Sequence, residues 1–408
     1  MKSKWIKRFI VSDGLVMALL VAPVVFAITA VEAPAGFDDL TNGFTTQTQF
    51  DLDREVFEEF EGIDDGLGPV YNAQACRECH QNPVTGGPSQ ITELRAGRLD
   101  GFGTFTNPPG GSLINDRAID AAIQERLTTA ENVVANRSSL NLLGDGFVEA
   151  IPDSEFTRIR NAQPTSMKGQ IINVPVLESP GTTRIGRFGW KNQQASLLSF
   201  SADAYLNEMG ITSPLQPTEN TSMGASVAAF DTVPDPEEAP TATEPFGPDV
   251  EIFARFMRAT KAPPRDTALA ATAAAQSGAT LFVQIGCANC HTPTITTAPA
   301  GTVFNGGKFT VTAALGDKII HPYSDFMLHD VGTGDGIVQN GGSATRNKLR
   351  TPPLWGLRTK SRLMHDLFNT TRFNTILRHT NEAEPVIQNF INLSTTNQNN
   401  LLTFLNSL

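Results

Sequence analysis

Two short motifs of the sequence carry the residue types that attach and ligate a redox cofactor. Both read C-x-x-C-H, at residues 76–80 and 287–291. Their reactive members are Cys76, Cys79, His80, Cys287, Cys290 and His291. In such a motif the two thiols bond covalently to one haem and the histidine becomes an axial ligand of its iron. We therefore expect two covalently bound haems c, one at each motif.

The two motifs use all four cysteines of the chain. No thiol is left for a disulfide or for a catalytic nucleophile. Paired thiols also occur in thioredoxin-like redox sites and in structural zinc sites with dispersed ligands. Two complete copies that consume every cysteine favour haem over both alternatives.

The histidines are distributed unevenly between the two motifs. Of six, only His80 precedes Gly286. The other five are His291, His321, His329, His365 and His379. Two strong axial ligands make an electron-transfer haem, whereas one leaves a position for a small oxidant. We expect two haems with different tasks, the far side of the first being left to Tyr71, Tyr205, Met209 or water.

The N-terminus has the pattern of an export signal. Four basic residues within the first eight precede an apolar run over residues 14–31, and small residues follow up to Ala33. This predicts a signal peptide at residues 1–33 and a periplasmic protein. An uncleaved membrane anchor is the alternative, because the run is about as long as the shortest membrane-spanning helix.

The net charge of the chain is −11, and residues 1–33 carry four basic and two acidic groups, so their removal leaves a charge near −13. An acidic surface argues against nucleic acid as a partner, since phosphates require a basic one. It suits contact with a basic electron carrier. Solubility alone explains the acidity equally well.

Each motif is preceded by a predicted helix, which indicates an internal repeat. The first covers residues 53–61, with Val56, Phe57 and Phe60 on its apolar face, and the second is an alanine-rich helix over residues 268–282. Leucines at helical spacing predict a closing helix at the C-terminus, capped by Thr395 or Thr396.

Residues 218–248 are rich in Pro, Thr, Glu and Ala and are predicted to form a linker. An apolar-striped helix over residues 250–260 follows. This places an N-terminal haem domain at residues 34–217 and a C-terminal cytochrome c domain at residues 249–408.

Several further motifs resemble those of a known family. In the C-terminal part these are residues 323–332, 350–357 and 364–366, and in the N-terminal part residues 66–69, 144–151 and 186–191. Together they are similar to the di-haem oxidoreductase family of peroxidases, which is related to bacterial di-haem cytochrome c peroxidases and to MauG. The resemblance implies a mainly α fold with two cytochrome-c-like domains and long loops.

The resemblance also implies iron ligands at the second haem. In these peroxidases the second ligand lies fourteen residues beyond a motif histidine that corresponds to His365, which gives His379. Relatives have methionine or tyrosine there, so this chain implies ligation by His291 and His379. A structural histidine, or ligation by Met364 or Met327, is the alternative. The resemblance leaves His329 and His365 to line the haem edge or to bind haem propionates.

Two catalytic roles follow from the same resemblance. Trp190 corresponds to a tryptophan that relays electrons between the haems, although Lys191 and Asn192 replace the usual Asp-Gly. Glu208 corresponds to a glutamate that moves a proton during peroxide cleavage, although the glutamine expected between these points is not evident. The alternatives are a buried core tryptophan and an exposed glutamate at a helix end.

Calcium in these relatives is held partly by positions that correspond to Lys360 and Arg362. Two cations argue against an identical calcium site, while a shifted one stays open. The expected function is an exported di-haem peroxidase that reduces hydrogen peroxide, or another small oxidant, with electrons from a small redox protein. The alternatives are a di-haem electron carrier without substrate chemistry and a MauG-like oxidase of an organic or protein substrate.

Overall fold

The computed structural model describes residues 1, 29–235 and 239–408. Most of the predicted signal peptide lies outside the described residues. Its last residues are described, and there strand β1 (Val31–Glu32) pairs in parallel with β13 (Lys318–Ile320). Among the helices described, none has the length and apolar character required to cross a bilayer.

The helix before the first motif, α1 (Gln47–Glu58), begins earlier than predicted because the Thr46 side chain accepts a hydrogen bond from the Gln49 amide. It ends before Phe60, which is exposed. Helix α6 (Pro248–Ala259) packs against it, and the Phe256 ring lies 5.3 Å from that of Phe50. The helix predicted over residues 250–260 is thus α6, and it packs against α1, the helix that precedes the first motif.

The alanine-rich segment before the second motif is two helices, α7 (Thr267–Ala270) and α8 (Ala273–Gln284). The prediction of one helix over residues 268–282 was wrong because Thr272 caps α8 through the Ala275 amide. The closing helix α11 (Thr395–Asn406) is capped by Ser394 instead of Thr395 or Thr396. It packs against α8, as an internal repeat of the α1–α6 arrangement requires.

A small sheet follows the first motif. Strand β3 (Thr92–Leu99) pairs with β4 (Phe105–Thr106), β5 (Leu113–Ile114) and β7 (Val133–Ser138). In the β3–β7 register Glu93 lies opposite Arg137. Of the residues that the structure describes, 32% are helical and 14% are in strands, so the expectation of a mainly α fold holds only in part.

The remaining elements are short. The helices are α2 (Cys76–Cys79), α3 (Asp145–Glu149), α4 (Asp153–Ala162), α5 (Leu197–Ala204), α9 (Arg372–Leu377) and α10 (Glu384–Ile391). The strands are β2 (Val70–Tyr71) with β6 (Arg117–Ala118), β8 (Asn173–Pro175) with β9 (Thr183–Ile185), β10 (Ile295–Thr296) with β13, β11 (Val303–Phe304) with β12 (Phe309–Thr310), and β14 (Leu328–His329) with β15 (Leu349–Arg350).

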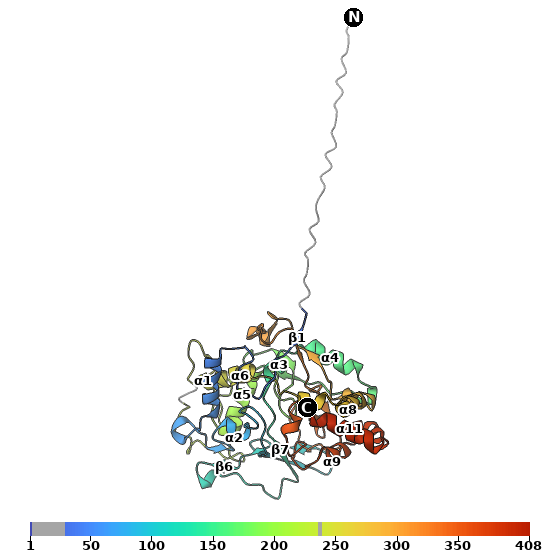
Figure 1. Cartoon of the computed structure of the whole chain (residues 1–408). Helices are drawn as coiled ribbons and strands as arrows, with labels where there is room; N and C mark the ends of the chain where they lie inside the picture. The colour runs from blue at the N-terminus through green and yellow to red at the C-terminus, as the bar shows by residue number, and fades with distance from the viewer. Residues whose placement is uncertain (2–28, 236–238) are drawn as a thin grey trace.

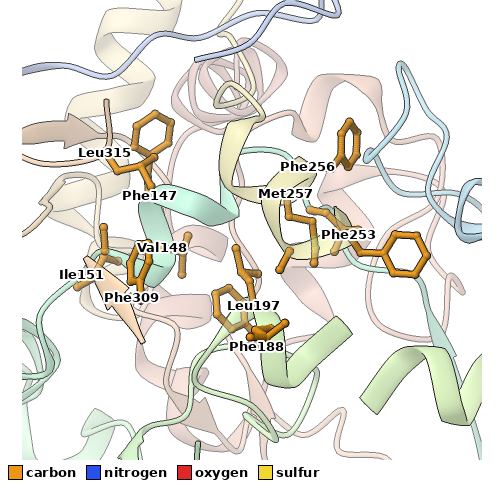
Figure 2. Packing of buried hydrophobic residues seen from close by; sticks show 14 of the residues in the cluster. Phe147, Val148, Ile151, Phe188, Leu197, Phe253, Phe256, Met257, Phe309 and Leu315 are labelled. Atoms are coloured by element: carbon orange, nitrogen blue, oxygen red, sulfur yellow. The ribbon is translucent and has the colours of Figure 1, made fainter. Parts of the chain in front are cut away.

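The larger hydrophobic core joins residues far apart in sequence. Figure 2 shows Phe147 and Val148 of α3 beside Leu315 and Phe309, with Met257 of α6 across from them in the same core. A second core around Phe282 and Phe404 lies under the second motif. In Figure 1, α1, α2, α5 and α6 lie on one side of the molecule and α8, α9 and α11 on the other. The division into domains at residues 218–248 stays a prediction.

Candidate haem sites

The second motif opens onto a cavity of about 510 Å³, within the range of cofactor pockets. Cys287, Cys290 and His291 line it. Its apolar wall comprises Phe282, Leu363, Ile376, Val386, Ile387, Leu401 and Leu405. An apolar slot edged by two thiols and a histidine is the environment that a covalently attached haem requires.

Two histidines that line this cavity each have one ring nitrogen bonded to a backbone carbonyl. His291 Nδ1 donates to the Tyr323 carbonyl at 3.0 Å, and His379 Nδ1 donates to the Thr375 carbonyl at 2.8 Å. A backbone acceptor on one ring nitrogen fixes the tautomer and leaves Nε2 for the metal. Burial, and then the charge of His379, lowers the pKa of His291 to about 4, which keeps it in the neutral, ligating form.

The two methionine alternatives differ in position. Met364 lines the cavity, whereas Met327 is fully buried in the larger core. Ligation by His379 stays a prediction, and Met364 is the alternative that the geometry leaves.

Three cations in the cavity wall fit the carboxylates of a haem. The Nε atoms of Arg350 and Arg372 are buried, with no hydrogen-bond partner in the described part of the chain. Burial, and the nearby charge of Arg350, lower the pKa of Lys360 to about 8. Clustered buried cations are costly without an anion, and haem propionates supply two. Lys360 is therefore suited to bind an anion and not calcium.

The remaining histidines have distinct surroundings. His329 bonds Asp325 and Glu382 through its two ring nitrogens, so it has no N–H left for a haem propionate. His365 lines the cavity, and its buried Nδ1 has no partner among the described residues. Exposed His321 pairs with Glu32 at 3.0 Å, away from the cavity.

Trp190 lies where this cavity approaches the first motif. Its indole Nε1 donates to the Ser138 carbonyl at 2.8 Å, and its ring contacts the His365 edge at a centroid distance of 6.0 Å. The same cavity is lined by Leu140 and by Asn82, which follows the first motif closely. Trp190 thus stands between the two motifs, and its role as an electron relay stays a prediction.

The lysine that replaces the family's aspartate after this tryptophan is buried in an ion cluster. Lys191 Nζ lies 2.9 Å from Asp335, which also pairs with Arg137 at 2.6 Å. The three side chains are fully buried. The resemblance places an aspartate after the tryptophan, where this chain has Lys191. Here Asp335, from a distant segment of the chain, provides a carboxylate at this place instead.

At the first motif, α2 places Cys76 and Cys79 one turn apart, with His80 next to them. The segment carrying Glu208 lies directly against this motif. The amides of Asn72 and Ala73 donate to the Glu208 carbonyl at 2.7 and 3.1 Å, and Asn72 Nδ2 donates to its carboxylate at 2.7 Å.

Local backbone geometry explains this approach. Helix α5 continues into a π-helical turn over Tyr205–Met209, a distortion often found at functional sites. Gly210 follows with φ +70°, and a side chain at Gly68 would collide with its backbone. Only residues without Cβ atoms allow these two segments to touch.

A second carboxylate accompanies Glu208. Burial, and then the charge of Glu93, raises the pKa of Glu208 to about 8. Burial also opposes ionisation of Glu93, yet Arg95 at 2.7 Å and Arg137 lower its pKa below the ordinary value. At neutral pH, Glu93 is charged and Glu208 holds a proton beside Cys79.

Which group faces the iron of the first site stays a prediction, and the candidates Tyr71, Tyr205 and Met209 all pack in or against the larger core. Tyr205 donates to Asp249 at 3.0 Å inside the larger core, and Met209 is buried there as well. Tyr71 is half-buried against the same core. Sequence reasoning missed Glu93 and Arg95, although alternate charges within a short β-rich segment are a signal for one polar face of a strand.

Comparison with known proteins identifies related sequences. A family model described as "Di-haem oxidoreductase, putative peroxidase" matches residues 114–408. No curated protein matches the chain significantly.

Three solved structures show a likeness along nearly the whole chain. A MauG-like protein associated with microbial copper homeostasis is 16% identical, with a TM-score of 0.42 and 95% of each chain covered. The diheme peroxidase BthA from Burkholderia thailandensis E264 is 12% identical, with a TM-score of 0.41 and 95% of each chain covered. Kuenenia stuttgartiensis hydrazine synthase is 14% identical, with a TM-score of 0.40, and the match covers 97% of this chain and 100% of that one.

Proposed function

The chain belongs to the di-haem oxidoreductase family, and from this premise we propose that it is an exported, c-type di-haem peroxidase. One haem is attached through Cys76 and Cys79 and the other through Cys287 and Cys290. Hydrogen peroxide is the substrate, and a small redox protein in the periplasm supplies the electrons.

The proposal rests on the different side chains that the two sites contain. The second site presents two imidazoles, His291 and His379, each bonded to a backbone carbonyl through Nδ1, and in the described part of the chain no hydrogen bond engages either Nε2. The first presents His80 and, near Cys79, the protonated carboxyl of Glu208. A closed iron transfers electrons, and an open iron beside an acid suits peroxide reduction.

When bound, the haems supply the electrons that reduce the O–O bond. The residues of the chain handle the protons. Glu208 would give its carboxyl proton to the departing oxygen, which leaves as water, and take the proton from the other oxygen. The two electrons, and two protons from the solvent, would then convert that other oxygen to a second water. Asn72, bonded to the Glu208 carboxylate, holds it in place for this transfer. Arg95 keeps Glu93 ionised, which maintains the proton on Glu208.

The test uses the full protein matured by export. Mass spectrometry should find two covalent haems and no residues 1–33. Electron paramagnetic resonance of the ferric protein should show one low-spin iron, and an iron that reacts with peroxide at least after half-reduction.

A mature chain without two haem-sized additions would contradict the c-type assignment. If both irons are low-spin and neither binds peroxide, cyanide or carbon monoxide, the protein is an electron carrier. Rapid oxidation of an organic substrate without peroxide turnover would instead indicate a MauG-like oxidase.

A further inference from the structure

His329 lies between two carboxylates in the interior of the protein. Its side chain is 2% exposed, with Nε2 2.8 Å from Asp325 Oδ2 and Nδ1 2.8 Å from Glu382 Oε2. Ionised carboxylates only accept hydrogen bonds. Both ring nitrogens therefore carry protons, and the ring is an imidazolium.

Both carboxylates are also held by groups other than His329. Asp325 accepts hydrogen bonds from Gln163 Nε2 at 2.6 Å and from the Met327 amide at 3.0 Å. Glu382 accepts one from the Asp330 amide at 3.2 Å, with Lys348 Nζ 3.7 Å away. These contacts fix the two carboxylates on either side of the His329 ring.

The electrostatic balance at His329 supports the same protonation state. Burial alone opposes the charged ring. The charge and hydrogen bond of Asp325 outweigh it and raise the pKa of His329 well above the ordinary value, with Glu382 adding to the effect.

This cation lies against the second motif. His329 Nδ1 is 3.7 Å from Cys290 Sγ, and the Asp325 amide donates to the Cys290 carbonyl at 2.9 Å. The backbone turn around Asp325 contains Tyr323 and Phe326 at φ +49° and +55°. This left-handed conformation is costly for residues with large side chains. The same turn presents the Tyr323 carbonyl to His291. One strained turn thus orients the axial histidine and brings the charged cluster to the attachment cysteine.

We propose that His329 is a positioning residue that raises the reduction potential of the haem attached through Cys287 and Cys290. The inference rests on the proposed haem at that site. Ferric haem carries one more positive charge than ferrous haem, so a cation held nearby in a poorly solvated site disfavours the ferric form. The negative charges of Asp325 and Glu382 lower the reduction potential. Removal of His329 and removal of a carboxylate should therefore shift the potential in opposite directions.

The experiment is a spectroelectrochemical titration of the mature protein and its variants. His329→Gln removes the cation and should lower the potential of the His291 haem. Glu382→Gln removes an anion from the same cluster at a partly exposed position and should raise it. His321→Gln, the same substitution at a surface histidine, should leave the potential unchanged.

Shifts of opposite sign in the two variants indicate an effect of charge. Loosened packing would instead admit water to the haem in both variants and move both potentials in the same direction. Shifts of equal sign, or no shift in either variant, would overturn the inference. If the wild-type protein has no haem on Cys287 and Cys290, the proposed function fails first. If the haem is present and the opposite shifts are missing, only the role of His329 fails.

Discussion

At the level of single residues, the second site contains two imidazoles with the same hydrogen-bonding pattern. His291 and His379 each donate through Nδ1 to a backbone carbonyl, of Tyr323 and Thr375 respectively. Such a bond fixes the tautomer in which Nε2 can ligate a metal, and we predict that both rings ligate the same iron. Replacement of either ring should therefore change the spin state of one iron and leave the other unchanged.

His379→Gly should convert the second haem from low-spin to high-spin, because the ligand is removed while the attachment cysteines remain. Electron paramagnetic resonance measures the change. Met364→Leu is the matched control and should retain the low-spin signal. An unchanged spectrum in His379→Gly, with loss of the low-spin signal in Met364→Leu, would identify the methionine as the ligand.

Glu208→Gln should slow the reaction with peroxide by about 10²–10⁴-fold, the usual contribution of general acid–base catalysis, without loss of haem. In the wild type, Glu208 holds its proton below its pKa of about 8. The rate should therefore fall as pH rises through about 8. Stopped-flow spectra recorded across pH measure both effects.

Glu93→Gln tests the second carboxylate. The charge of Glu93 raises the pKa of Glu208, so its removal should move the fall in rate to lower pH. Glu155→Gln is a control outside the first motif, since Glu155 pairs with exposed Arg158. An unshifted profile in Glu93→Gln would show that Glu208 titrates independently.

Among the secondary-structure elements, the crossing of α8 and α11 determines whether the second cavity closes. At Gly278 a Cβ atom would collide with the Asn400 carbonyl. Gly278→Ala should therefore push α11 away and destabilise the protein by about 1–3 kcal/mol, as overpacked sites do. Thermal unfolding measures the loss. Gly101→Ala, where a Cβ meets no atom within 4 Å, should change the melting temperature little.

The sequence was sufficient to predict the elements with strong local patterns. Both C-x-x-C-H motifs, the helices before them and the closing helix follow from spacing and apolar periodicity. Helix starts were misplaced where a single side chain, Thr46 or Thr272, forms a cap between one and two turns away from the expected start.

The charged clusters could not be predicted in the same way. Glu93 reaches Glu208 through the pairing of β3 and the contact of Gly68 with Gly210, and Lys191 finds Asp335 across the fold. Partners of this kind are set by tertiary packing between remote segments, which leaves no periodic signal in either segment.

Across the whole molecule, Trp190 connects the cavity of the second haem with the loop after the first motif. Trp190→Phe should leave the first reaction with peroxide fast and slow the exchange of electrons between the haems. Single-turnover spectra after half-reduction measure the two steps separately. Equal rates of exchange in both proteins would show that the tryptophan is only a core residue.

The ion cluster of Arg137, Lys191 and Asp335 joins the N-terminal half of the chain to the C-terminal half. Asp335→Asn leaves two buried cations without their shared anion, and loss of one partner from such a pair costs about 3–5 kcal/mol. Denaturant unfolding should show this loss at neutral pH. Burial opposes ionisation of Asp335, but Arg137 and Lys191 lower its pKa, so its stabilisation is present at neutral pH and is lost on acidification.

The position of α11 in the cavity wall also bears on the order in which the two motifs are enclosed. Leu401 and Leu405 line the same cavity as residues of the second motif, although more than a hundred positions separate them in the chain. Helix α6, which packs against the helix before the first motif, emerges during synthesis well before α11 does. The first motif can thus be enclosed first, while the second motif stays accessible for haem attachment until the last helix arrives.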